Sequence, residues 1–257
     1  IGLKCFEGIA ARVKSARIVD MADRILPAIL DETGAKMVQS ALEAHGAEFF
    51  LSDSVLRFEG NTAHLKSGKT VEFDLLVIAV GVRPNTELVK EAGGTVRRGI
   101  AVDECGRTSL PDIFAAGDCA ESFDIASGTN RVLALLPNAA FQGRAAGVNM
   151  AGGKARLDNA VAFNSIGFFS THVMTAGVYE GEEYCERTER TYKALFTKDG
   201  LLKGFILVNL PERAGIYLKL LKERIPLSAV DFEALKTSPA WSAFSPEARA
   251  ENFAREV

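Results

Sequence analysis

The chain has 257 residues, a net charge of −3 at neutral pH, and 47% hydrophobic and 25% charged residues, which is ordinary for a globular protein of one large or two medium domains. Without a basic surplus we expect no nucleic-acid partner, and without an apolar run of roughly 20 residues we expect no membrane span. The 3 histidines and 4 cysteines show no metal-ligand or C-x-x-C spacing, so we expect no metal site, and free thiols in a cytoplasmic protein.

The first twenty residues follow the second half of a dinucleotide-binding pattern. Apolar residues at helical spacing predict a helix over 2–14, and a short strand over 16–20 ends in Asp20. Gly2 fits the third glycine of G-x-G-x-x-G, and Asp20 stands where an acid contacts a nucleotide ribose. The first strand and two glycines of that pattern would precede Ile1, so we expect a fragment of a longer protein. Asp20 as a solvated strand-end acid remains the alternative.

Alternating elements continue to residue 85. A helix is expected over 32–45, with Asp31 as its N-cap and Gly46 just beyond its end. Four short strands separated by turn residues follow, near 47–51, 54–59, 61–66 and 70–73. The apolar run over 74–80, closed by Gly81, predicts a parallel strand buried on both faces.

The middle of the chain contains its most specific motif. Two short strands are expected within 96–119, around a Cys105-Gly106 turn. From Thr108 the chain reads T-S-L-P-D-I-F-A-A-G-D, a polar turn and a short strand that ends in Gly117 and Asp118. Glycine lets a ligand approach the backbone, and open α/β sheets bind nucleotides at the carboxyl ends of their strands. The alternative is a turn-forming Gly-Asp pair.

A helix opened by Leu136-Pro137 and running to Met150 follows, with a boundary at Gly152-Gly153. The pattern then changes to β-like segments followed by helices. The strands are expected at 163–169, 172–178, 191–197 and 201–208, and the helices at 211–223, 228–236 and 245–255.

The motif ending in Asp118 resembles the second flavin-binding motif of the FAD-dependent pyridine nucleotide–disulfide oxidoreductase family, in its NADH:rubredoxin reductase and NADH oxidase-like branch. Residues 77–85 resemble the family's A-x-G-x-x-P-N segment, and residues 137–149 its A-x-x-Q-G-x-x-A-A-x-N helix. The resemblance implies an α/β fold made of the remainder of two Rossmann-like dinucleotide-binding domains plus a C-terminal α+β dimerisation-type domain. The NAD-binding part would span 1–84, the second half of the FAD-binding domain 85–158, and the dimerisation domain 159–257.

The same resemblance implies a set of cofactor-binding residues. Gly117 and Asp118 would meet the ribityl chain of FAD, and Gly81 would line the nicotinamide nucleotide. Gly2 and Asp20 would serve NADH, because an acid favours the 2′-hydroxyl over a 2′-phosphate. The N–H groups of Ala139 and Ala140 would face the flavin pyrimidine, where negative charge develops on reduction. Turn formation by Gly81 and ordinary packing of the helix are the alternatives.

The implied function is hydride transfer from NADH to FAD, with electrons passed to a rubredoxin-like carrier, oxygen or a disulfide. No catalytic residue is assigned: Lys4 replaces the acid that many relatives carry, and a surface pair of Lys4 with Glu7 is expected. His172 is expected to pack or hydrogen-bond, and Cys119 to be a buried small residue. A homodimer is expected, FAD is expected to be absent from the fragment alone, and a catalytically inactive dimerisation or nucleotide-sensing module remains the alternative.

Overall fold

The computed structural model describes residues 1–158 and 160–254. The N-terminal part begins with α1 (Gly2–Ile9), a 3-10 turn (Ala10–Arg12), β1 (Ala16–Val19), α2 (Glu32–Glu43) and β2 (Ala47–Phe50). β1 and β2 pair in parallel, and the meander β3 (Val55–Glu59), β4 (Thr62–Leu65), β5 (Thr70–Glu72) forms a separate antiparallel sheet. These elements confirm the sequence prediction for residues 1–73.

Local chemistry explains the bounds of α2. The Asp31 carboxylate accepts a hydrogen bond from the Gly34 N–H at 2.7 Å, as an N-cap residue does. Gly46, just beyond the helix, has φ of +93°, which favours glycine. Asp31 also accepts a hydrogen bond from the Tyr192 hydroxyl, so the cap fastens α2 to the C-terminal sheet.

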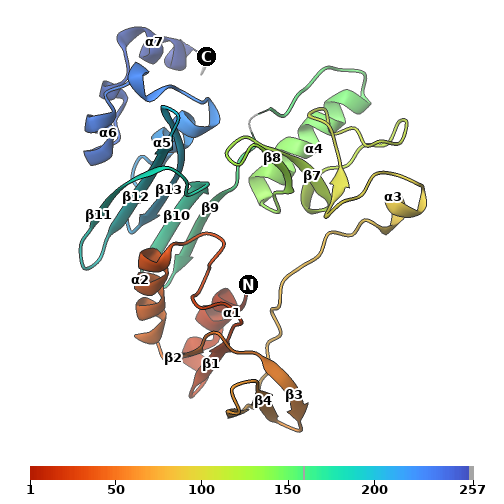
Figure 1. The fold of residues 1–257 in the computed structure, drawn as a ribbon, viewed down its shortest axis with the longest axis vertical. Helices are drawn as coiled ribbons and strands as arrows, with labels where there is room; N and C mark the ends of the chain where they lie inside the picture. The colour runs from red at the N-terminus through yellow and green to blue at the C-terminus, as the bar shows by residue number, and fades with distance from the viewer. Residues whose placement is uncertain (159, 255–257) are drawn as a thin grey trace.

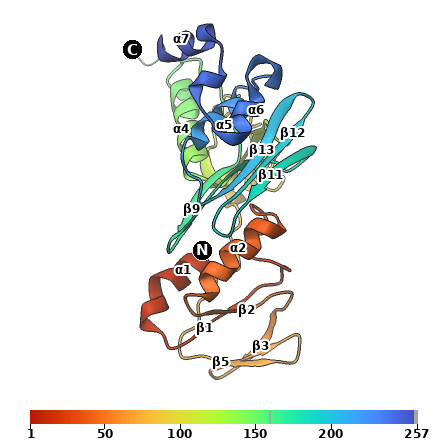
Figure 2. The same ribbon diagram turned by 90° about the vertical axis from the view of Figure 1, so that its left-hand side faces the viewer.

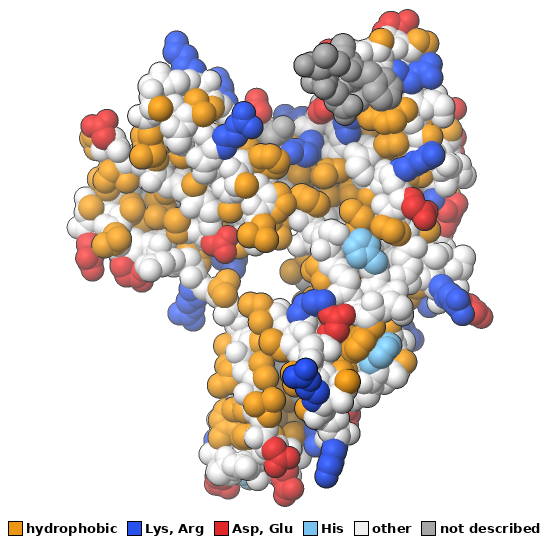
Figure 3. All heavy atoms as spheres, turned by 180° about the vertical axis from the view of Figure 1, so that it is seen from behind, with side chains coloured by type: hydrophobic (Ala, Val, Ile, Leu, Met, Phe, Trp, Pro, Cys, Tyr) orange, Lys and Arg blue, Asp and Glu red, His pale blue; other side chains and the backbone are white. Residues whose placement is uncertain are grey.

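The predicted buried strand over 74–80 is wrong for this structure. The segment belongs to no strand and runs as an extended, exposed connection to the middle part of the chain (Figure 1), with Val80 91% exposed. Hydrophobic side chains therefore gather on the surface of the lower part of the molecule (Figure 3). A strand buried on both faces needs hydrogen-bonding neighbours, and β1 pairs only with β2 in the described part of the chain. The apolar pattern of residues 74–80 does not show whether such a neighbouring strand is present.

The middle part is a small sheet covered by one long helix. α3 (Glu87–Glu91) leads to β6 (Ile100–Ala101), the 3-10 turn η2 (Gly117–Cys119), β7 (Ala120–Asp124) and β8 (Thr129–Val132). β6 pairs in parallel with β7, which pairs antiparallel with β8. The strand expected before Gly117 is reduced to one bridge between Arg107 and Phe114. α4 (Leu136–Met150) confirms the predicted helix.

The C-terminal part is a five-stranded antiparallel sheet, ordered β11-β12-β13-β10-β9. Its strands are β9 (Phe163–Phe168), β10 (Thr171–Gly177), β11 (Glu182–Arg187), β12 (Tyr192–Lys198) and β13 (Leu201–Val208). The helices α5 (Ala214–Lys222), α6 (Phe232–Thr237) and α7 (Pro246–Ala254) follow. All were predicted except β11, whose exposed, charged residues lack an apolar pattern.

Both faces of this sheet bury a core. On one face Phe205 and Leu207 pack with Tyr217 and Leu220 of α5. On the other, Ile206 and Val208 share a cluster with residues of α1 and α2, which lie below the sheet in Figure 2. The sheet thereby joins the N-terminal part to the rest of the molecule. No helix in the described ranges is both long and apolar enough to cross a membrane.

Candidate cofactor site

The motif that ends in Asp118 folds as a turn followed by a short extended segment. The Thr108 hydroxyl donates to the Ile113 carbonyl at 2.9 Å and accepts from the Leu110 N–H at 3.1 Å, which closes the polar turn. Gly117 then adopts φ of +81° and begins η2. This left-handed conformation favours glycine. The backbone therefore requires glycine at position 117, in addition to the need to leave room for a ligand.

Gln142 of α4 clamps η2 in place. Its side-chain Oε1 accepts a hydrogen bond from the Gly117 N–H at 2.6 Å, and its Nε2 donates to the Ser122 hydroxyl at 3.0 Å. The side chain is buried, at 4% exposure. A Cβ added to Gly117 would lie 3.7 Å from the Cβ of Ala139, so the flavin-type motif rests directly on the first turns of α4.

The carboxylate of Asp118, in η2 beside α4, is available to a ligand. The residue is exposed, and its side chain forms no hydrogen bond or ion pair within the described ranges. Acids nearby in the sequence behave differently: buried Glu121 accepts from the Gly99 N–H at 3.2 Å, and buried Asp124 from the Ala126 N–H at 3.1 Å. Asp118 is therefore free to accept hydrogen bonds from hydroxyl groups of a ligand.

The N–H donors expected at Ala139 and Ala140 need correction. The Ala139 N–H donates to the Leu135 carbonyl at 2.9 Å, and Ala140 lies one residue further into the helix. Only the first residues of a helix leave their N–H groups without an intrahelical acceptor. At α4 these are Leu136 and Asn138, because Pro137 has no N–H, and no side chain caps them. The sequence placed the start of the helix correctly at Leu136, but the donors were assigned to residues too far into it.

The start of α4 is open to a ligand. Leu136 is 89% exposed, whereas Asn138 is buried and donates through Nδ2 to the Val161 carbonyl at 3.0 Å. Aligned peptide dipoles concentrate partial positive charge at this end of the helix. Gly117, Asp118 and the α4 start therefore form one surface with an acceptor on one side and donors on the other.

A cavity of about 350 Å³ lies beside the segment that leads into α4. Its walls come from Ile29, from the end of β8 and the residues that follow it (131–135), and from β9 and β10, including Asn164 and Thr175. Tyr179 also lines it and donates its hydroxyl to the Ile29 carbonyl at 2.6 Å. Burial raises the pKa of Tyr179 to about 12, so this hydroxyl stays protonated and donating at neutral pH.

The second group of predicted residues lies in the N-terminal part. A Cβ added to Gly2 would lie 3.4 Å from the Cβ of Ala79, so Gly2 allows close approach of α1 to the 74–80 segment. Gly81, two residues on, is exposed with φ of +98° and no atom near its Cβ position. The structure therefore places Gly2 beside the 74–80 segment. It does not bring Gly2 and Gly81 together with Gly117 and Asp118 in one site.

Asp20 is exposed and directly follows β1. One carboxylate oxygen accepts from the Ala22 N–H at 2.9 Å, and the backbone N–H donates to the Phe50 carbonyl at 3.0 Å. Arg24, the first cation after Asp20 in the sequence, is engaged elsewhere: it donates to the Asp23 carboxylate at 3.0 Å and to the Leu30 carbonyl at 3.4 Å. Asp20 keeps one oxygen for a ligand, and no cation of residues 1–158 or 160–254 pairs with it.

The predicted pair of Lys4 with Glu7 forms, but it reaches beyond the surface of α1. Lys4 Nζ also donates to the Gly167 carbonyl at 2.9 Å, and Glu7 accepts from the Phe169 N–H. The hydrogen bond from Lys4 lowers the pKa of Glu7. The pair thus ties α1 to the β9–β10 hairpin.

His172 hydrogen-bonds Ser165 at 3.0 Å, as expected.

Two amides were missed as positioning residues. Gln142 holds η2, and Asn149 near the other end of α4 donates to the Cys105 and Ala155 carbonyls at 2.9 and 2.8 Å. Both are buried, and both belong to the Q-G and A-A-x-N pattern of the helix. The sequence did carry a signal for this role: Gln142 and Asn149 are polar residues that recur on a helix face otherwise made of small residues.

A turn with a free acid lies against a helix start within a mixed α/β fold, an arrangement that fits a dinucleotide-binding site. Residues 1–143 match the pyridine nucleotide-disulphide oxidoreductase family, and the chain belongs to that family. FAD and NADH are the cofactors of this family.

Several relatives place the chain within the family. It is 32% identical over 241 residues to NADH-dependent phenylglyoxylate dehydrogenase subunit epsilon of Aromatoleum evansii, covering 89% of this chain and 57% of that one. It is 37% identical to an NADH oxidase of Methanocaldococcus jannaschii, covering 61% of this chain and 36% of the relative. The chain therefore spans little more than half of the first relative, and less of the second.

Solved structures show the same fold. An FAD-dependent pyridine nucleotide-disulphide oxidoreductase from Desulfovibrio vulgaris matches with a TM-score of 0.82 and 25% identity, over 90% of this chain and 64% of that one. The putidaredoxin reductase of a covalent complex with putidaredoxin matches with a TM-score of 0.83 and 21% identity, over 93% of this chain and 59% of that one. The arrangement of sheets and helices is thus one that the family uses.

Proposed function

We propose that the chain supplies part of a flavin site and part of an NADH site in an oxidoreductase that passes hydride from NADH to FAD and then electrons to an acceptor. The proposal keeps the division into residues 1–84, 85–158 and 159–257. The observation that carries it is the free Asp118 carboxylate held by η2 against the open start of α4.

The residues at η2 and α4 fit the ribityl and pyrimidine half of FAD. The Asp118 carboxylate would accept hydrogen bonds from ribityl hydroxyls, and Gly117 offers no side chain in their path. The N–H groups of Leu136 and Asn138 would face the pyrimidine carbonyl and stabilise negative charge there. FAD, when bound, supplies the hydride-accepting chemistry, while the protein positions it.

The N-terminal part favours NADH over NADPH. A ribose 2′-hydroxyl can donate to the free oxygen of Asp20, whereas a 2′-phosphate would face a second anion. Arg24 is held by Asp23 and Leu30 and is not placed to offset that repulsion. Gly2 and Gly81 would leave room for the nucleotide backbone.

The electron acceptor is proposed as a class: a one-electron redox protein such as a rubredoxin-like carrier, oxygen, or a disulfide. Relatives include a rubredoxin-NAD(+) reductase of Pseudomonas putida, 31% identical over 147 residues. The four cysteines of this chain are all free thiols. We also propose a homodimer, in a cytoplasmic protein, which a mass measurement in solution would test.

A second candidate function is supported by the exposed 74–80 segment. If this segment stays without strand partners, nucleotide binding could persist without turnover, and the chain would act as a nucleotide-sensing or dimerisation module. The discriminating measurement is NADH binding beside NADH-driven flavin reduction on the same preparation.

Asp20→Asn tests the proposed function, in a protein that contains this chain and any residues encoded before Ile1. The asparagine retains the hydrogen bond to the Ala22 N–H and removes only the charge. Anaerobic flavin bleaching at 450 nm should then show a smaller preference for NADH over NADPH. Glu48→Gln removes an exposed charge from β2 and serves as the control. An unchanged preference in Asp20→Asn contradicts the NADH site, and NADH binding without bleaching in the unaltered protein favours the second candidate.

A further inference from the structure

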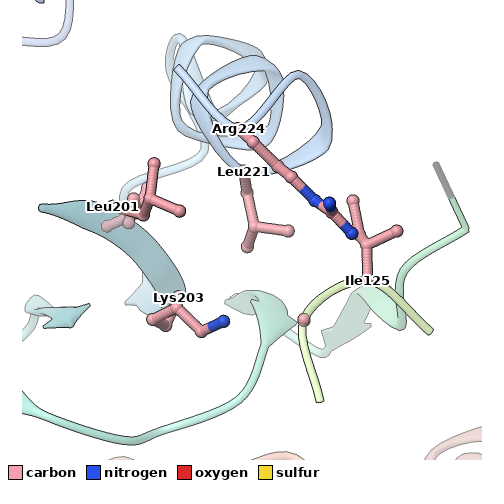
Figure 4. A pocket seen from close by; sticks show the side chains of 7 residues that line it. Ile125, Leu201, Lys203, Leu221 and Arg224 are labelled. Carbon is pink, nitrogen blue, oxygen red and sulfur yellow. The ribbon is translucent and has the colours of Figure 1, made fainter. Parts of the chain in front are cut away.

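A second cavity, of about 210 Å³, lies between the middle and C-terminal parts of the chain and away from the proposed cofactor site. Its walls are Ile125 in the turn after β7, Leu202 and Lys203 of β13, Leu221 of α5, and Arg224 just beyond α5 (Figure 4). The volume is below the ~300–1,000 Å³ typical of drug-sized ligands, so it suits a smaller molecule.

Two cationic side chains enter this cavity. The guanidinium of Arg224 points across it toward Ile125, and the Lys203 side chain enters from β13 on the other side of Leu221 (Figure 4). Neither side chain has a hydrogen bond or ion pair with any residue that the structure describes. Other lysines of the same part of the chain are paired, Lys198 with Glu180 and Lys219 with Glu223.

Lys203 stands at an irregular position of β13. Gly204 pairs with Phe196 and Leu202 with Thr197, so Lys203 has no register partner in β12 and strict alternation of faces does not apply to it. Leu202 and Phe205, on either side of it, both belong to the core under α5. The half-buried Lys203 side chain therefore lies at the edge of an apolar core and lines the cavity.

Arg224 occupies a backbone position that favours glycine. Its φ of +50° places it in the left-handed region directly after Glu223, the C-cap residue of α5. The Arg224 N–H donates to the Leu221 carbonyl at 3.3 Å, and the Ile225 N–H to the Leu220 carbonyl at 3.0 Å, which closes the helix end. These bonds satisfy terminal carbonyls that would otherwise repel an anion.

The one acid in the adjacent turn is already engaged. Asp124 is buried, with one oxygen accepting from the Ala126 N–H at 3.1 Å and the other from Arg131 at 3.4 Å. It therefore does not pair with Lys203 or Arg224. The cavity keeps two free positive charges against the apolar walls of Ile125, Leu202 and Leu221.

We propose that this cavity binds a small organic carboxylate with an apolar body. The carboxylate would pair with Arg224 and Lys203, and the apolar body would lie against Ile125 and Leu221. The ligand would bridge the turn after β7 and the end of α5. This site goes beyond the proposed hydride transfer, because none of the residues assigned to FAD or NADH lines it.

The test uses benzoate, with benzamide as its neutral counterpart and acetate as an anion without an apolar body. Amide NMR spectra of the chain should show saturable shifts at Ile125, Lys203 and Arg224 with benzoate. Benzamide and acetate should each bind about tenfold more weakly or worse, as expected for losing one charged contact or the apolar contacts. Equal shifts from benzoate and benzamide, or no saturation at millimolar benzoate, would overturn the proposal.

Matched variants separate the charge from the backbone effect. Arg224→Gly removes the cation and suits the left-handed backbone, so it should raise Tm without ligand and abolish the Tm increase caused by benzoate. Arg213→Gly, at the left-handed position before α5, should also raise Tm but retain the benzoate effect. Lys203→Gln should weaken the binding of benzoate, and Lys198→Gln should leave it unchanged. Retained benzoate binding in both Arg224→Gly and Lys203→Gln contradicts the site.

Discussion

The clamp formed by Gln142 makes a quantitative prediction about η2. Gln142→Leu keeps a similar volume but removes the acceptor of the Gly117 N–H and the donor to Ser122. Each partner left unsatisfied costs about 1–3 kcal/mol when buried. Because Gly117 is only partly buried, we expect the variant to lose roughly 2–4 kcal/mol in free energy of unfolding, against about 5–15 kcal/mol for a typical domain.

Amide hydrogen exchange measured by NMR, together with urea unfolding, reads this effect at Gly117. In the unaltered chain the Gly117 amide should be protected, since its acceptor is a buried side chain. In Gln142→Leu its exchange should speed up by about tenfold for each ~1.4 kcal/mol lost locally. The amide reports the flavin-type turn itself, whereas urea unfolding reports the whole cooperative unit.

Asn149→Leu provides the control in the same helix. Asn149 is also buried; it donates to the Cys105 and Ala155 carbonyls and accepts from the Ala155 N–H, but it does not touch η2. This variant should lose comparable stability while Gly117 retains the local protection that Gln142 provides. Equal Gly117 exchange in the unaltered chain and in Gln142→Leu would refute the clamp.

Three further predictions concern the rest of the chain. The amides of 75–80 should exchange almost without protection in monomeric residues 1–257, because they pair with no strand, and strong protection there would contradict the exposed connection. The same preparation should be colourless and lack NADH oxidase activity, since the chain spans only 57% of the length of its relative from Aromatoleum evansii; stoichiometric flavin at 450 nm would overturn this. All four tyrosines have a raised pKa, chiefly by burial and, for Tyr184, by its hydrogen bond to Glu186. The contribution of these tyrosines to the free energy of unfolding should therefore be fully present below about pH 10. It should fall as the pH rises from there, because the unfolded chain releases phenolic protons that the folded chain retains. Absorbance at 295 nm should stay low until the chain unfolds, and titration near pH 10 in the folded state would disprove this.

Local chemistry made much of the fold predictable. Asp31 and Gly46 bound α2 as the sequence indicated, because caps act over a few residues. The motif ending in Gly117 and Asp118 was found because its turn residues, its glycine and its acid stand in adjacent positions and resemble a family motif. The positive φ of Gly117 is seen only in the structure.

The errors arose where the outcome depends on distant partners. The 74–80 run is apolar enough for a buried strand, yet strand formation needs a hydrogen-bonding neighbour that sequence periodicity does not report. β11 was missed because its pairing with β12, rather than its own composition, makes it a strand. The donors at Ala139 and Ala140 were assigned too far into a helix whose start was predicted correctly, because the Ala139 N–H already donates to the Leu135 carbonyl. The clamping role of Gln142 required the contact between α4 and η2.

The central claim is that Asp118, seated on α4, binds flavin. It is tested most directly by flavin occupancy of Asp118→Asn, in a protein that contains this chain and any residues encoded before Ile1. Asp112→Asn is the control, because Asp112 is an exposed acid of the same motif, and asparagine tolerates its φ of +60°. We predict a lower ratio of absorbance at 450 nm to 280 nm for Asp118→Asn only. An unchanged ratio in Asp118→Asn would contradict the claim.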